Sequence, residues 1–130
     1  MDAGMLEAFL RTNTTGVLAT VRPDGRPHAA PVGFAVTGPR FVIASLLDAA
    51  RVRNVRANPH ASLVVTLGAG TAHAAVIAEG TARIVAPLEA TLEMRAPFRD
   101  ATDALPAWIG AFVVVSPERL LTYAAPAFEP

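Results

Sequence analysis

Short stretches of alternating apolar and polar residues recur along this chain, a pattern typical of strands with one buried face. The following ranges are therefore predicted to be strands: 16–21, 27–36, 41–45, 61–67, about 73–85, 111–115 and 120–123. PDG at 23–25 forms a turn between the first two, because Pro presets φ and Gly accepts positive φ. SPER, beginning at residue 116, is predicted to be the last turn.

Three segments have helical rather than alternating patterns. Residues 3–11 suit a short amphipathic helix with Met5, Leu6, Phe9 and Leu10 on one side. A second helix follows Asp48, which is expected to cap it, and Pro59 ends it. Residues 87–98 are expected to start as a third helix, with Pro87 at its first position. Residues 100–110 are expected to be irregular or briefly helical.

The order of these elements predicts the fold class. Strands follow one another as hairpins rather than alternating with helices, so the fold is expected to be mainly β with short α-helices. We expect six or seven mostly antiparallel strands in one domain, 1–130, closed or nearly closed into a barrel that removes exposed edges. Pro27 and Pro31 cannot donate ladder hydrogen bonds, so their strand is an edge or is bulged on one side. Gly80 marks an expected bulge.

Composition narrows the range of partners. Eleven acidic residues balance eleven basic ones, which argues against general binding to nucleic acid or anionic membranes and leaves self-association open. Every basic residue is Arg, so Schiff-base chemistry is excluded and an anion must be held by Arg or backbone N–H groups. There is no cysteine, no basic leader and no apolar run long enough to span a bilayer, so we expect a soluble cytoplasmic protein.

Side chains suited to catalysis are scarce. His28, His60 and His73 lack metal-ligand spacing, so no metal site is predicted. GAG at 68–70 is too short for a dinucleotide loop, and no nucleophile motif or acid–base carboxylate pair is present. If the chain is an enzyme, a cofactor carries the chemistry.

The segment 41–65 is the most informative for binding. A strand ends at Ser45, a short loop follows, and a helix begins with Arg51 in its first turn. Helix N-termini favour anions, and Arg can clamp a phosphate through two hydrogen bonds. Arg53 and Arg56 point elsewhere around the helix. The alternative is an ordinary solvated basic face, and Asp48 adds unfavourable negative charge at this helix start.

Several motifs in order extend this interpretation: LATVRPDGRPHAAPV, FVIAS, RVRNVRANPHASLVV, VIAEGTARIV and SPERLLTY. Over residues 5–123 the sequence resembles the pyridoxamine 5′-phosphate oxidase-like flavin-binding split-barrel proteins. The resemblance implies a Greek-key-like split β-barrel homodimer, with a flavin at each subunit interface and oxidoreductase activity. The cofactor in such proteins is FMN or, in one branch, a deazaflavin (coenzyme F-420).

The resemblance also assigns roles to particular residues. The backbone of the second strand, at Ala30, Pro31 and Val32 and on to Phe34, would lie along the flavin ring. Ser45, followed by Leu46, would contact the cofactor at the end of the third strand. Arg51 would hold the phosphate, and Asn54, three positions on, would be a further polar contact.

The sequence departs from the family pattern beside Arg51. Family members often have Ser and a second basic residue where this chain has Ala49 and Ala50. Each missing charge-assisted contact is worth about 1.5–3 kcal/mol, so FMN binding is expected to be weak or another cofactor to be used. Residues that would hold a substrate phosphate are not matched, so pyridoxamine phosphate oxidation is not predicted.

Three functions stay open: an FMN-dependent oxidoreductase of unknown substrate, a deazaflavin-dependent reductase, and a non-catalytic flavin or small-ligand binding module. The late apolar residues Trp108, Ile109, Phe112 and Val114 are expected to face a second copy of the chain. The ranges 68–72 and 98–110 are expected to form the substrate loops.

Overall fold

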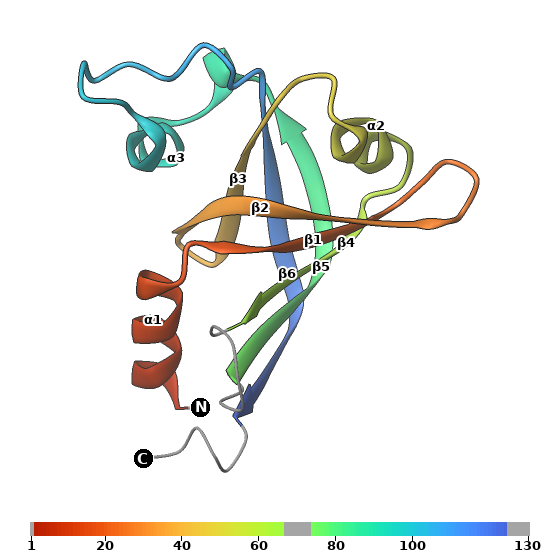
Figure 1. The fold of residues 1–130 in the computed structure, drawn as a ribbon, viewed down its shortest axis with the longest axis vertical. Coiled ribbons are helices and arrows are strands. Elements are labelled where there is room, and N and C mark those ends of the chain that lie inside the picture. Colours follow the sequence, from red (N-terminus) through yellow and green to blue (C-terminus); the bar gives the residue numbers. More distant parts are fainter. Residues whose placement is uncertain (1, 67–73, 125–130) are drawn as a thin grey trace.

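Six strands form a closed barrel in the computed structural model, which describes residues 2–66 and 74–124 (Figure 1). Neighbouring strands are antiparallel and follow the order β1-β2-β3-β6-β5-β4. The strands are β1 (Thr15–Val21), β2 (Pro27–Thr37), β3 (Arg40–Ser45), β4 (His60–Thr66), β5 (Ala74–Val85) and β6 (Ala111–Ala124). This architecture confirms the predicted mainly β, antiparallel barrel. Leu67, the ranges 68–70 and 68–72, and His73, all used in the sequence predictions, lie outside the described residues.

Short helices cover parts of the barrel. α1 (Ala3–Thr12) precedes β1, whereas α2 (Ala50–Ala57) and α3 (Leu92–Arg95) lie near the same end of the long strands (Figure 1). The segment 87–98 starts at Pro87 with a helical turn as predicted, but it is not one helix, because extended residues at Ala90 and Thr91 interrupt it. In its place, α3 lies between two 3₁₀ turns, η1 (Pro87–Glu89) and η2 (Ala96–Phe98). Among the described residues, no helix combines the length and apolar character that crossing a bilayer requires.

β6 is one continuous strand, so the turn predicted at SPER is wrong. Glu79 pairs with Arg119 but Gly80 pairs with Pro117, which leaves Glu118 as an extra residue in β6. The chain therefore absorbs SPER as a bulge, and the expected irregularity at Gly80 lies mainly in the partner strand. Gly80 is needed there because a Cβ would collide with the Ser116 carbonyl oxygen and lie 2.9 Å from the Glu118 nitrogen.

β2 changes partners along its length. Residues 27–33 pair with β1, and residues 34–37 pair with β3. The Phe34 amide donates to the Thr14 carbonyl (2.9 Å), so the even-numbered residues of β2 bond toward β1. The odd-numbered residues 27–33 therefore direct their N–H and C=O groups to the other edge. No described strand covers this edge along residues 27–32, whereas the Phe34–Ile43 pairing places the Gly33 C=O against the Ala44 N–H of β3. Pro27 and Pro31 lie at odd positions, so neither removes a ladder bond, and the expected edge is present in this half of the strand.

Two hydrophobic clusters stabilise the molecule. The first fills the barrel and includes Leu18, Phe34, Leu63 and Val113. The second lies outside the barrel wall, between that wall and the segment 86–110. It contains Val42, Val85, Ala90, Met94, Ile109, Phe112 and Val114.

This second cluster overturns the predicted partner-facing surface. Ile109, Phe112 and Val114 are 6%, 0% and 1% exposed within the single chain. Other residues of the same chain cover these side chains. For example, the centroids of the Phe98 and Phe112 rings are 5.5 Å apart. Only Trp108 of the four predicted residues is exposed, at 53%.

Candidate functional site

A groove of about 390 Å³ opens between the middle of β2 and the connection from β3 to α2. Pro31–Gly33 form one wall and Ala44–Leu46 the other. Arg51 and Trp108 complete the lining. The groove follows the edge of β2 away from β1, so the Gly33 N–H and the Pro31 carbonyl are directed toward it. In the described part of the chain, this donor and this acceptor pair with no neighbouring strand.

Ser45 holds the Arg51 side chain in position at one end of this groove. Arg51 Nη1 donates to Ser45 Oγ (2.9 Å), and Ser45 Oγ donates to the Leu46 carbonyl (2.8 Å). Ser45 is only 1% exposed, so this orientation is built into the wall. Arg51 Nε is buried and has no hydrogen-bond partner among the residues that the structure describes.

The electrostatics of Arg51 favour an anion. Burial lowers the pKa of Arg51 because the charged guanidinium loses hydration. Arg nevertheless stays protonated in proteins, so its unbalanced charge remains available to a negative group. A phosphate at this position would restore the hydrogen bonding that the guanidinium gave up on burial.

The start of α2 adds free backbone N–H groups beside Arg51. Ala49 occupies the N-cap position and makes no side-chain cap bond, so the prediction that Asp48 caps the helix is wrong. Asp48 instead accepts a hydrogen bond from Arg53 Nη1 through its backbone carbonyl (2.9 Å). Arg53 is thereby held on the outside of the helix. The Val52 amide donates to the Ala49 carbonyl (3.0 Å), whereas the Ala50 and Arg51 amides have no backbone partner among the described residues and can meet an anion.

The groove brings together five of the seven residues predicted to bind cofactor. They are Pro31, Val32, Ser45, Leu46 and Arg51. Ala30 and Asn54 lie outside this lining. Asn54 is 3% exposed, and its Nδ2 donates to Thr20 Oγ1 (3.0 Å), so its side chain joins α2 to β1.

Sequence reasoning missed Trp108 as part of this lining. Its position depends on the loop before β6, where the Gly110 amide donates to the Ser45 carbonyl (2.9 Å). A Cβ on Gly110 would lie 2.7 Å from Leu47 Cβ, so glycine is required for this close approach. In the sequence, the only indication of this arrangement is that Trp108 and Gly110 come just before a strand. That spacing does not reveal that Gly110 packs against Leu47.

Residues 4–125 match the family model described as pyridoxamine 5′-phosphate oxidase. The chain belongs to this family. The same barrel fold is also found in solved structures of other proteins. The heme storage protein HutZ of Vibrio cholerae has a TM-score of 0.75 and 20% identity, with 94% of this chain and 93% of that chain covered.

Two further solved structures have the same fold. An FAD-binding protein of Mesorhizobium loti has a TM-score of 0.72 and 19% identity, covering 96% of each chain. General Stress Protein 26 of Bacillus anthracis has a TM-score of 0.74 and 18% identity, covering 92% of this chain and 91% of that chain. At these identities the likeness shows the fold. In residues 2–66 and 74–124, no three His, Cys, Asp or Glu side chains are grouped as a metal site would require.

Proposed function

We propose that this member of the pyridoxamine 5′-phosphate oxidase family binds FMN in the β2–α2 groove and acts as a flavin-dependent oxidoreductase. The observation that carries the proposal is Arg51, whose guanidinium is oriented by Ser45 and has a buried, unpartnered Nε. This arrangement suits the phosphate of FMN. The family match to residues 4–125 supports the same choice of cofactor.

The remaining lining suits a flat ring with polar atoms along one side. The Gly33 N–H and the Pro31 carbonyl would pair with the ring's polar edge, and Trp108 would exclude water from one side. FMN, when bound, supplies hydride and electron transfer. The chain's own residues bind the phosphate, orient the ring and limit its hydration.

Ala49 and Ala50 limit the affinity expected of this site. Neither provides a hydroxyl or a charge, so Arg51 is the one charged side chain lining the described part of the groove. Arg53 and Arg56 are exposed on α2, where they could serve a longer anionic tail such as that of the deazaflavin coenzyme. Parallel titrations with FMN and the deazaflavin decide between them, and FMN binding about tenfold tighter is expected.

The decisive variant is Arg51→Gln, with Arg53→Gln as the matched control. Flavin fluorescence is followed during FMN titration. Loss of a charge-assisted contact worth about 1.5–3 kcal/mol predicts roughly 10- to 150-fold weaker binding for Arg51→Gln. Arg53→Gln should bind FMN as the wild type does. Equal affinities in the two variants, or no FMN binding by the wild type, would refute the proposal. FMN binding without electron transfer to any acceptor would favour a non-catalytic binding module.

We also propose a homodimer, through a surface other than the one expected from sequence. Cross-strand pairing aligns a row of apolar side chains across five strands: Pro31, Val17, Val64, Ile77 and Leu121. Val64 and Ile77 alternate with buried neighbours on their strands, and Val17 is 43% exposed. The row ends at Pro31, so a second copy bound there would lie beside the FMN groove. Light scattering should therefore show a dimer at micromolar concentration.

A further inference from the structure

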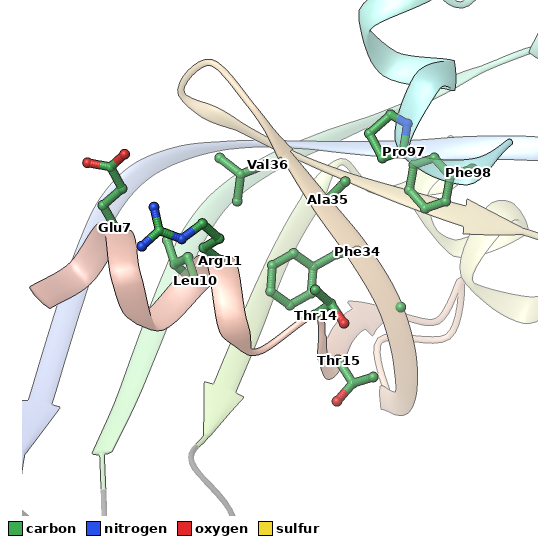
Figure 2. A pocket seen from close by; sticks show the side chains of 11 residues that line it. Glu7, Leu10, Arg11, Thr14, Thr15, Phe34, Ala35, Val36, Pro97 and Phe98 are labelled. Atoms are coloured by element: carbon green, nitrogen blue, oxygen red, sulfur yellow. The ribbon is translucent and has the colours of Figure 1, made fainter. Parts of the chain in front are cut away.

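A second and larger groove lies beside α1. It has a volume of about 660 Å³, within the usual range for small-molecule sites. Figure 2 shows side chains of α1 on one side of β2, and Pro97 and Phe98 on the other. Its lining is Glu7, Leu10, Arg11, Thr14, Thr15, Gly33, Phe34, Ala35, Val36, Pro97 and Phe98.

This groove adjoins the proposed FMN groove at one residue. Gly33 lines both, and it is the last β2 residue paired with β1. A Cβ added at Gly33 would meet no side chain, and the nearest atom is the Thr14 carbonyl oxygen at 3.9 Å. A molecule in the larger groove could therefore approach a ring that occupies the other groove without crossing a protein wall.

The larger groove has its own unused backbone edge. Phe34 bonds to Thr14 on this side of β2, and β1 begins only at Thr15. Val36 is two residues beyond Phe34, so its N–H and C=O are directed to the same side. Within the described part of the chain, the Val36 backbone has no partner on this side. One donor and one acceptor are thus presented together at the edge of an apolar groove.

The charges around the groove favour a neutral occupant. Glu7 and Arg11 contribute one charge of each sign from α1, and both are exposed. Leu10, Pro97 and Phe98 give the remaining walls an apolar character. An ionised ligand would lose hydration here without a buried countercharge, whereas a neutral ring would bury its faces at little cost.

We infer that this groove is the substrate site and that it takes a neutral planar ring compound with adjacent hydrogen-bond donor and acceptor groups, such as a lactam. Its donor and acceptor pair with the Val36 C=O and N–H. Its ring reaches the flavin over Gly33. The substrate role rests on the proposed FMN site, whereas the binding of the lactam does not.

Quinolin-2-one is the probe, and N-methylquinolin-2-one, which lacks the donor, is the matched ligand. Backbone amide NMR of the apoprotein should show saturable shifts at Gly33 and Val36, with Kd below about 1 mM. The N-methyl compound and the anionic quinoline-2-carboxylate should each bind about tenfold more weakly. Equal binding of the three probes, or shifts confined to residues near Arg51, would overturn the assignment.

Thr14→Trp fills the groove with a large side chain, and Ala101→Trp places the same side chain on an exposed loop elsewhere. Thr14 is exposed and bonds to Phe34 only through its carbonyl, so the fold should survive. Thr14→Trp should weaken quinolin-2-one binding by about tenfold or more and leave FMN titration unchanged, whereas Ala101→Trp should change neither. Unchanged probe binding in Thr14→Trp would refute the site.

A final measurement separates this inference from the FMN proposal. Adding quinolin-2-one to the FMN-loaded protein should shift the flavin absorbance, because the two molecules meet at Gly33. Lactam binding to a protein that does not bind FMN would refute the FMN proposal and the substrate role together. Binding of both without any flavin response would refute the substrate role alone.

Discussion

The two hydrophobic clusters lie on opposite sides of the same wall of β3 and β6 but are built differently. Val113 and Val115 face the barrel interior, where alternating strand residues meet one another. Phe112 and Val114 face outward and are covered by the irregular segment 86–110. Consequently both faces of β6 are buried over residues 111–115, although only one face belongs to the barrel.

The difference shows how binding is coupled to stability in this molecule. The barrel cluster sets the strand order and depends on no loop. The outer cluster fixes segment 86–110, and that segment delivers Trp108 to one groove and Pro97 and Phe98 to the other. Damage to the outer cluster should therefore disturb both grooves, even where the strands remain paired.

The largest effect is expected from Val114→Arg. Val114 is 1% exposed in the outer cluster, and an unpaired buried charge costs on the order of 3–5 kcal/mol. A small domain has only about 5–15 kcal/mol in total, so denaturant titration should show a protein that is mostly unfolded or severely destabilised.

Val17→Arg is the matched substitution on the exposed face of β1. It should change the free energy of unfolding of one chain by only about 0.5 kcal/mol. It should nevertheless dissociate the proposed dimer in light scattering. If Val114→Arg instead folded stably and only lost the dimer, the outer cluster would be an interface and its assignment here would be wrong.

A smaller loss of stability is expected from Gly80→Ala, in β5 opposite the bulge of β6. The new methyl group would collide with the Ser116 carbonyl, and overpacking of this kind costs about 1–3 kcal/mol. Gly33→Ala adds the same group into open space and should leave the melting temperature nearly unchanged. Equal melting temperatures for the two variants would contradict the close contact at the bulge.

A stabilising effect is expected at Ala49, the N-cap position of α2 that lacks a side-chain cap bond. Ala49→Ser supplies the missing N-cap of α2 and should stabilise the fold by about 1 kcal/mol while strengthening FMN binding. Ala49→Asp should stabilise similarly, but its charge opposes the phosphate and should weaken FMN binding. Thermal melts and FMN titrations separate the two effects, and parallel changes in affinity would argue against a phosphate at Arg51.

Most of the fold could be predicted because its signals are local. The alternation of Leu18 with its neighbours, and the PDG turn whose Gly25 has φ 88°, identify strands and a hairpin without reference to distant residues. The wrong predictions occur where contacts between residues far apart in the sequence determine the local structure. SPER has the composition of a turn, but pairing with β5 keeps it in a strand, and the outer cluster breaks the helix predicted over 87–98.

The candidate site was predictable to a similar degree. Arg51 and Ser45 could be identified from the sequence because the end of a strand and the start of a helix lie close together along the chain. Trp108 was not, because its place depends on Gly110 packing against Leu47. Asn54 was predicted as a ligand contact from its position in a motif, whereas its hydrogen bond to Thr20 depends on a strand more than thirty residues earlier.

The two prolines of β2 have a consequence for solubility. An uncovered strand edge normally invites another chain to add a strand, the first step toward aggregation. Such addition requires donors at regular intervals, and on this edge positions 27 and 31 have none. An added strand would therefore lack hydrogen-bond donors at regular intervals, whereas a small ring needs only the Gly33 N–H and the Pro31 carbonyl. The same edge can remain open to a ligand and closed to fibril growth.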